Sequence, residues 1–151
     1  MRRLPEVGGI ITAEQVLQTA ESIAAIQEPD GGVPWPEGHV DAWNHIECLM
    51  ALTVAGLTEE ARKGFDWLVR HQRPDGSWPR KLVRGEPVET AGESNHAAYI
   101  AVGVWHDLLI TGDEDFARRM WPTVVRALEF VVGLQTRRGE ILWLREPDGT
   151  P

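Results

Sequence analysis

The chain has 151 residues, of which 42% are hydrophobic and 25% charged, and its formal net charge is −8. This length suffices to bury the core of one domain, and the composition excludes a disordered chain. The negative charge disfavours nucleic acid as a partner, and the longest apolar run, from Ala97 to Trp105, is too short to cross a membrane.

Cysteine content and the N-terminal sequence indicate the compartment. Cys48 is the only cysteine, so an intrachain disulfide is impossible. The first residues, Met1-Arg-Arg-Leu-Pro5, lack the apolar stretch of a signal peptide. We therefore expect a cytoplasmic protein without a membrane span, for which contact with a membrane surface remains open.

Hydrophobic periodicity predicts five helices and almost no strand. The helices are expected at 12–26, 41–55, 58–71, 94–110 and 113–134, after an N-terminal extension at 1–11. The expected N-caps are Thr12, Asp41, Thr58 and Asp113, and Gly56 and Gly112 are expected to end two of the helices. Pro122 is expected to kink or split the last helix.

The helices are of two kinds. Those at 12–26, 58–71 and 113–134 are amphipathic, whereas those at 41–55 and 94–110 are apolar around most of their circumference. This alternation predicts three outer helices and two inner helices covered on all sides. The predicted fold class is all-α, a curved solenoid or α/α toroid of stacked helical hairpins in a single domain, 1–151.

A turn of one type follows each amphipathic helix. The three copies run from Gln27 to Trp35, from Gln72 to Trp78 and from Gln135 to Trp143. Each has a Gln at the helix end, a polar turn with a Gly, and then a Trp. We expect the Gln amide to bond to free backbone groups of a neighbouring helix and the Trp to pack over the corner.

The second copy, with the helix before it, resembles the QW repeat of squalene and hopene cyclases. The matching residues run from Lys63-Gly64-Phe65-Asp66-Trp67-Leu68 through Gln72 to Gly76-Ser77-Trp78. The copy at 126–143 matches except for a longer gap before Trp143, and the first copy is degenerate. The resemblance implies the terpenoid cyclase and prenyltransferase superfamily, and within it bacterial, especially actinobacterial, prenyltransferase-like proteins.

That family's toroid has six inner and six outer helices, so five helices resemble its N-terminal half. The resemblance implies a cavity for an isoprenoid-like apolar substrate. The DxDD acid cluster of the cyclases and the DDxxD diphosphate motif are both absent from this sequence. Asp113-Glu-Asp115 is the nearest acidic cluster, and at a helix start it is more readily explained by capping.

Metal and cofactor sites are not predicted. Protein prenyltransferases of this fold hold zinc through Asp, Cys and His, and Asp41, His45 and Cys48 lie at helical spacing. The family's Asp and Cys are two residues apart, however, so we interpret Cys48 as a small buried apolar residue. We expect neither a metal nor a cofactor.

The cavity is expected where the inner helices begin, between loops 31–41 and 79–95. Its predicted lining residues are Trp35, Glu37, His39, Trp43, Asn95, His96 and Tyr99, and the catalytic candidates are Asp41, Glu89 and Glu93. Trp105 is a further aromatic candidate. The residues assigned to the structural repeat are Gln27, Gln72, Trp78, Gln135 and Trp143. Capping is the favoured role of Asp41.

Two other function classes stay open. The segment from Thr111 to Leu134 resembles a stretch of six-hairpin glycosidases, which use paired carboxylates; Glu37 or Asp41 would then face Glu89 or Glu93 across a cleft. Trp35 or Trp43 would stack on the sugar. The third class is a non-catalytic α-solenoid that binds a partner through its concave face.

The prediction as a whole is a transferase or isomerase of the prenyltransferase and terpenoid cyclase type, taking a small apolar or sugar-like substrate. A half toroid leaves the flanks of its inner helices uncovered. We therefore expect the chain to form a homodimer or aggregate, or to be completed by a C-terminal half, and to lack turnover alone.

Overall fold

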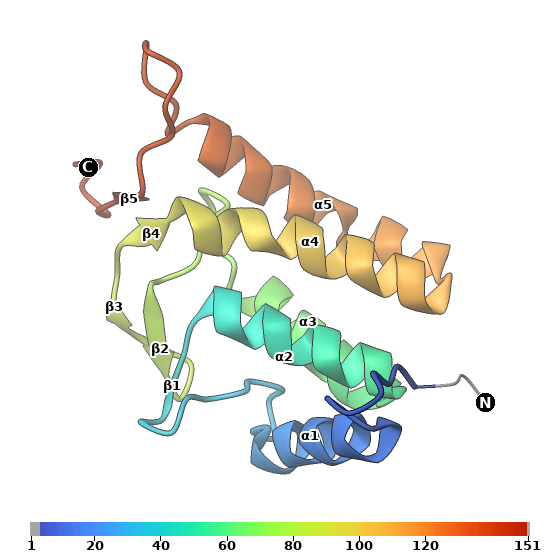
Figure 1. Ribbon diagram of the computed structural model, residues 1–151. Helices are drawn as coiled ribbons and strands as arrows, with labels where there is room; N and C mark the ends of the chain where they lie inside the picture. Colours follow the sequence, from blue (N-terminus) through green and yellow to red (C-terminus); the bar gives the residue numbers. More distant parts are fainter. Residues whose placement is uncertain (1–3, 151) are drawn as a thin grey trace.

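The computed structural model describes residues 4–150 and contains five helices within them (Figure 1). They are α1 (Ala13–Ile26), α2 (Ala42–Ala55), α3 (Thr58–His71), α4 (Ser94–Thr111) and α5 (Glu114–Val132). The predicted helices are confirmed to within two residues at each end. Helix α5 runs through Pro122 as one element, so the predicted split does not occur.

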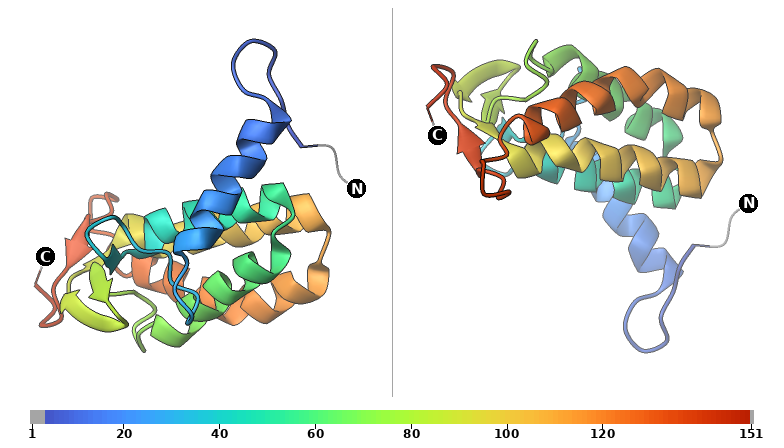
Figure 2. Two further views of the ribbon diagram at one scale, coloured as in Figure 1. Left: turned by 90° about the horizontal axis from the view of Figure 1, so that it is seen from below. Right: turned by 90° about the horizontal axis from the view of Figure 1, so that it is seen from above.

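The helices form two layers. Helices α2 and α4 lie side by side and run in the same direction, while α3 packs against α2 and α5 against α4 (Figure 1). Helix α1 contacts α2 and projects obliquely from the other four (Figure 2). This arrangement confirms α2 and α4 as the inner helices and α1, α3 and α5 as the outer ones.

Two glycines allow the helices to approach closely. A Cβ on Gly64 of α3 would lie 2.1 Å from Leu49 Cδ2 of α2, and one on Gly103 of α4 would lie 2.5 Å from Ile46 Cγ2. Interior atoms pack at van der Waals distance, so neither position accepts a larger residue without moving the helix. Phe65 of α3 fills the space between these contacts and is fully buried.

The expectation that both inner helices are covered on all sides is wrong for α4. Val102, Trp105 and Leu109 of α4 are exposed, as is Trp121 of α5. These side chains lie on the flanks that face away from α2 and α3. Within residues 4–150, no element covers them.

The corner turns connect successive outer helices. Gln27 Nε2 donates to Gly31 O at 2.9 Å and to Glu60 O of α3 at 3.0 Å. Gln72 Nε2 repeats this pattern, with Gly76 O at 3.0 Å and Thr123 O of α5 at 2.9 Å. Each Gln therefore closes its own turn and also holds the next outer helix.

A glycine in each of the first two turns touches that same neighbour. Gly31 and Gly76 have positive φ angles of 101° and 90°. A Cβ on Gly31 would lie 2.3 Å from Lys63 O, and one on Gly76 would lie 2.0 Å from Arg126 O. Glycine is required here both by the backbone conformation and by the close approach of the next helix.

Three of the four predicted N-caps are confirmed. Thr12 forms a full capping box with Gln15, and the carboxylates of Asp41 and Asp113 accept the backbone N–H three residues on. Thr58 is the exception. Helix α3 has Leu57 at its N-cap position, and no side chain caps it.

Short strands, which periodicity did not predict, gather at one end of the helices. They are β1 (His39–Val40), β2 (Lys81–Val83), β3 (Glu86–Glu89), β4 (Gly92–Glu93) and β5 (Leu144–Arg145). Strands β1, β2 and β3 form an antiparallel sheet in that order, and β4 pairs with β5. Pairing of His39 with Val83 joins the two loops, 31–41 and 79–95, that precede the inner helices.

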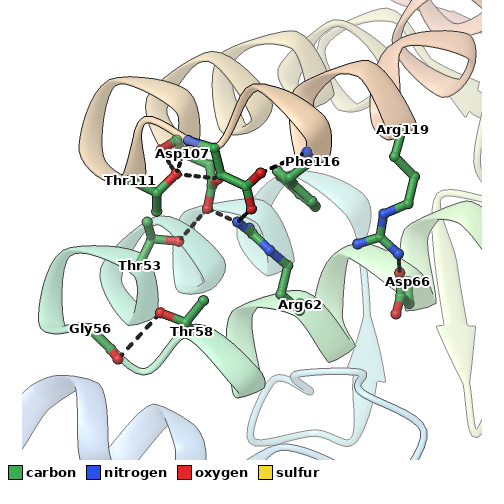
Figure 3. A network of polar contacts seen from close by, with 10 residues as sticks. Thr53, Gly56, Thr58, Arg62, Asp66, Asp107, Thr111, Phe116 and Arg119 are labelled. Atoms are coloured by element: carbon green, nitrogen blue, oxygen red, sulfur yellow. Dashed lines mark hydrogen bonds and ion pairs between the residues drawn. The ribbon is translucent and has the colours of Figure 1, made fainter.

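A polar network holds the opposite end of the helices together (Figure 3). Asp107 of α4 is 1% exposed and accepts from Arg62 Nη1 of α3 at 2.7 Å and from Thr53 Oγ1 of α2 at 3.3 Å. Arg62 Nη2 donates to Asp113 Oδ2 at 3.1 Å, and the guanidinium lies over the Phe116 ring. One buried carboxylate thus connects three helices.

None of the helices within residues 4–150 combines the length and hydropathy that a membrane span requires.

Candidate functional site

A pocket of about 270 Å³ opens at the strand end of the molecule, where α2 and α4 begin. We call it the carboxylate pocket. Its lining residues are Trp35, His39, Asp41, Trp43, Arg80, Lys81, Glu93, Asn95, His96 and Trp143. Two of them, Asp41 and Glu93, are nearly buried carboxylates at the N-termini of the inner helices.

Asp41 is bound through both of its oxygens. Oδ1 accepts the backbone N–H of Asn44 at 2.9 Å, which caps α2, and Oδ2 accepts Trp35 Nε1–H at 2.6 Å. The Asn44 side-chain amide lies 3.1 Å from Oδ1 and 3.0 Å from Oδ2. The capping prediction is confirmed, and the carboxylate also holds the loop that carries Trp35.

Glu93 occupies the N-cap position of α4, but its side chain makes no capping hydrogen bond. Its carboxylate instead receives Arg80 Nε at 2.6 Å and Trp143 Nε1–H at 3.2 Å. The carboxylate of Asp41 caps its helix. The carboxylate of Glu93 instead faces the pocket, and the Arg80 guanidinium balances its charge.

His96 lies between the two carboxylates. Its Nε2 is 3.4 Å from Glu93 Oε2 and 3.9 Å from Asp41 Oδ1, which puts these oxygens at most about 7 Å apart. Burial lowers the pKa of His96, opposed by the charges of Glu93 and Asp41. Its buried Nδ1 has no hydrogen-bond partner, so a second ring proton would be unsatisfied. A proton on Nε2 would face both carboxylates.

Aromatic rings surround the carboxylates. The Trp35 ring stacks on His39 with centroids 5.7 Å apart, and Trp43 packs on Tyr99 at 5.6 Å. Trp43 Nε1 and Tyr99 OH both donate to Glu47 Oε1, at 3.0 and 3.2 Å. Trp35 and Trp43 are each more than a third exposed, so they present ring surface to a ligand.

Charged side chains form one edge of the pocket. Glu89 lies 2.6 Å from Lys81 Nζ and 3.5 Å from Arg80 Nη1. The hydrogen bond from Lys81 lowers the pKa of Glu89. Glu89 is half-exposed in β3 and balances these two cations, while Glu93 alone of the two predicted glutamates reaches the buried part of the pocket.

The structure brings most of the predicted site residues together. The predicted residues found in the pocket are Trp35, His39, Asp41, Trp43, Glu93, Asn95 and His96. Glu37 lies instead in the exposed turn that Gly38 N closes onto Trp35 O. Tyr99 reaches the site only through Glu47 and Trp43. Trp105 lies well down α4 and is exposed.

Trp143 is a pocket residue that sequence reasoning assigned to the repeat alone. Pairing of β4 with β5 places Leu144 opposite Glu93, and Ser94 N donates to Trp143 O at 2.8 Å. The side chain is 62% exposed, unlike the buried Trp78 at the corresponding repeat position. One signal in the sequence distinguished Trp143 from Trp78, namely the longer gap before Trp143.

The residues weighed for zinc do not converge. His45 Nδ1 accepts from Val33 N at 3.2 Å, so Nε2 carries the proton and donates to Gly64 O at 3.0 Å. Both ring nitrogens of His45 therefore bind backbone groups, and neither is available to bind a metal ion together with Asp41 and Cys48. The described part of the chain holds no group of three His, Cys, Asp or Glu side chains arranged for a metal ion.

Comparison with known proteins links this geometry to carbohydrates. Over 147 residues the chain is 53% identical to the MMP endo-(1,4)-3-O-methyl-alpha-D-mannosidase of Mycolicibacterium hassiacum. The alignment covers 97% of this chain and 41% of that enzyme, so the chain spans less than half of its relative's length. No protein family profile matches the sequence.

The fold has a counterpart among solved structures. Cellobiose 2-epimerase from Bacillus thermoamylovorans superposes with a TM-score of 0.65 at 17% identity, over 87% of this chain and 39% of the epimerase. The all-α prediction, as part of an α/α toroid, is confirmed.

The prediction of a terpenoid cyclase or prenyltransferase with an isoprenoid cavity is wrong. The 53% identity to a mannosidase favours the glycosidase alternative instead. The error has a physical cause. The Gln, Gly and Trp of the repeat hold helical corners together, and any toroid of this type can use them whatever reaction it performs.

Proposed function

We propose that this chain contributes the carboxylate pocket of a carbohydrate-active hydrolase that cleaves α-1,4 linkages between 3-O-methylated mannose units. The observation that carries the proposal is that Asp41 and Glu93 both lie close to His96 Nε2, among exposed indoles. The identity to the mannosidase supplies the substrate class.

The chemistry required is that of glycoside hydrolysis. The reaction passes through a positively charged, oxocarbenium-like transition state, and paired carboxylates stabilise it and activate water. Both Asp41 and Glu93 accept N–H donors, which fixes the orientation of their carboxyl groups. Glu93 takes the proton from the attacking water, and Asp41 faces the developing charge.

With Glu93 as the base and Asp41 facing the developing charge, a further acid supplies the proton for the leaving oxygen. The exposed faces of Trp35, Trp43 and Trp143 provide stacking surfaces for sugar rings. Arg80, bound to Glu93, keeps that carboxylate oriented toward the pocket.

The test is a chimera in which this chain replaces the aligned segment of the Mycolicibacterium hassiacum enzyme. Hydrolysis of a 3-O-methylated α-1,4-mannose oligosaccharide is followed by the release of reducing ends. Glu93→Gln and Asp41→Asn should each lower kcat by about 10²- to 10⁴-fold. Glu37→Gln, outside the pocket, should leave kcat unchanged. Retention of activity by the Glu93 variant would refute the assignment.

We also infer that the exposed apolar side chains of α4 and α5 form a contact surface. Val102, Trp105, Leu109 and Trp121 are all exposed, and exposed apolar side chains that gather on one surface mark a contact site. Light scattering of the 151-residue chain should show self-association, and Trp105→Glu should reduce it. A monomer at high concentration would contradict this inference.

A further inference from the structure

A second cavity, of about 350 Å³, lies beside the carboxylate pocket. It is lined by Ile23, Val33, Pro34, Trp35, Pro36, Asn44, Glu47 and Cys48. Trp35 lines both cavities, so they adjoin at this residue. We call this second site the Trp35 cavity.

The walls of the Trp35 cavity are fixed by hydrogen bonds. Val33 N is held by His45 Nδ1 at 3.2 Å, Trp35 N by His39 O at 2.8 Å, and Trp35 Nε1 by Asp41 at 2.6 Å. A ligand therefore does not have to order the loop that forms this wall, so binding loses no conformational entropy for that step.

The Asn44 and Glu47 side chains that line this cavity both make hydrogen bonds. The Asn44 amide donates to Asp41, and Glu47 accepts from Trp43 and Tyr99. Burial, with the negative charges of Glu47 and Asp41, raises the pKa of the Cys48 thiol, so its sulfur stays neutral and apolar. A ligand hydroxyl that lies against Ile23, Val33 and the two prolines would lose water without gaining a partner, whereas an apolar group would not.

We propose that the Trp35 cavity receives the methyl ether of a 3-O-methylated hexose whose ring binds in the adjoining carboxylate pocket. This inference rests on the proposed function and adds the basis of its selectivity. The sugar ring stacks on Trp35, and its methyl group enters the apolar side while its free hydroxyls stay on the carboxylate side. Burial of one methyl group favours the methylated sugar about four-fold in Kd.

The experiment compares two ligands on the 151-residue chain. Methyl 3-O-methyl-α-D-mannopyranoside and methyl α-D-mannopyranoside are titrated separately, and Kd is obtained from the shifts of the tryptophan indole N–H signals. The expected result is binding of both, with the methylated sugar at least about four-fold tighter.

Two variants fill the Trp35 cavity from opposite walls, Cys48→Met from α2 and Ile23→Phe from α1. Each should remove the preference for the methylated sugar while the unmethylated sugar binds as before. Cys48→Ala leaves the cavity open and should keep the preference. Circular dichroism checks that each variant is folded. Because the two substitutions lie on different helices, the test can still be made if one of the variants does not fold.

The outcomes separate the two proposals. If both sugars bind equally, or if the preference survives both filling variants, the Trp35 cavity does not hold the methyl ether, and the carboxylate pocket still binds sugar. If neither sugar binds, the proposed function fails and this inference falls with it.

Discussion

The indole of Trp35 donates its N–H to Oδ2 of Asp41 at 2.6 Å, while Oδ1 of the same carboxylate caps α2. One side chain thus joins a helix start to the loop that divides the carboxylate pocket from the Trp35 cavity. Asp41 therefore contributes both to the stability of the fold and to the position of Trp35 beside a ligand. Substitutions of Asp41 and Trp35 can separate these two contributions.

Asp41→Ala should reduce the free energy of unfolding by about 1 kcal/mol more than Asp41→Asn does. Asparagine retains an oxygen that can cap α2, whereas alanine removes it. Both lose the acceptor for Trp35 Nε1. Denaturant unfolding measures the difference; equal destabilisation by the two variants would mean that the cap contributes nothing.

Trp35→Phe is the matched partner for a double-mutant cycle with Asp41→Asn. It keeps an aromatic ring, although a smaller one, and removes the N–H donor. Since the two residues share one hydrogen bond, their effects should fall short of additivity by about 1 kcal/mol. Strict additivity would show that the short contact carries no net energy.

Trp78 and Trp143 occupy equivalent repeat positions but should respond in opposite ways. Trp78 is 1% exposed and donates to Leu68 O at 2.8 Å, so Trp78→Ala should cost roughly 3–5 kcal/mol of stability. Trp143→Ala should change stability little, because that ring is mostly exposed, and should weaken sugar binding. The measurements are thermal unfolding and the methyl mannoside titration. A reversed pattern would contradict the assignment of Trp143 to the pocket.

His45 should make the protein less stable in mild acid. Burial lowers its pKa from 6.5 to about 4 in the folded protein. Above pH 6.5 both states are neutral, and its contribution is fully present. Between pH 6.5 and 4 the unfolded chain takes up a proton that the folded protein excludes. The free energy of unfolding should therefore fall by about 1.4 kcal/mol per pH unit in that window.

The control for this prediction is His45→Gln, whose side chain does not titrate. Denaturant unfolding at pH 7.5 and at pH 5 should give a smaller difference for the variant than for the parent chain. His96 and the carboxylates titrate in both proteins and cancel in the comparison. Identical pH dependence of the two would exclude His45 as the source.

Breaking the buried ion pair between Arg62 and Asp107 should cost far more stability than breaking an exposed ion pair. Asp107→Ala leaves Arg62 without its 2.7 Å partner in a setting where Asp107 is 1% exposed, and should cost about 3–5 kcal/mol. Asp66→Ala removes the exposed partner of Arg119 and should cost less than about 1 kcal/mol. Comparable losses in thermal stability would refute the special role of Asp107.

Local signals account for what the sequence predicted well. Helix bounds follow from caps such as Thr12 and from periodicity within each segment, and the corners follow from the Gln and Gly of each turn. Asp41 and Glu93 could be proposed because each precedes an apolar helix. Such signals need only neighbouring residues, so one sequence is sufficient.

Contacts between residues far apart in the sequence were not predicted. Strands of two to four residues leave no periodic pattern, and the pairing of β4 with β5 joins segments far apart in the chain. The place of Trp143 in the pocket follows from that pairing alone. The exposed flank of α4 was missed because apolar composition does not say which neighbour covers it.

The pairing of β4 with β5 has a kinetic consequence. Trp143 and Glu93 are 50 residues apart, and after α5 ends at Val132 the chain that carries Trp143 is held to β4 by strands of only two residues. Opening of this pair should therefore be frequent, and the Ser94 amide, which is bonded to Trp143 O, should exchange with solvent each time. A sugar that touches both residues would slow that exchange, so a single backbone amide reports whether the pocket is occupied.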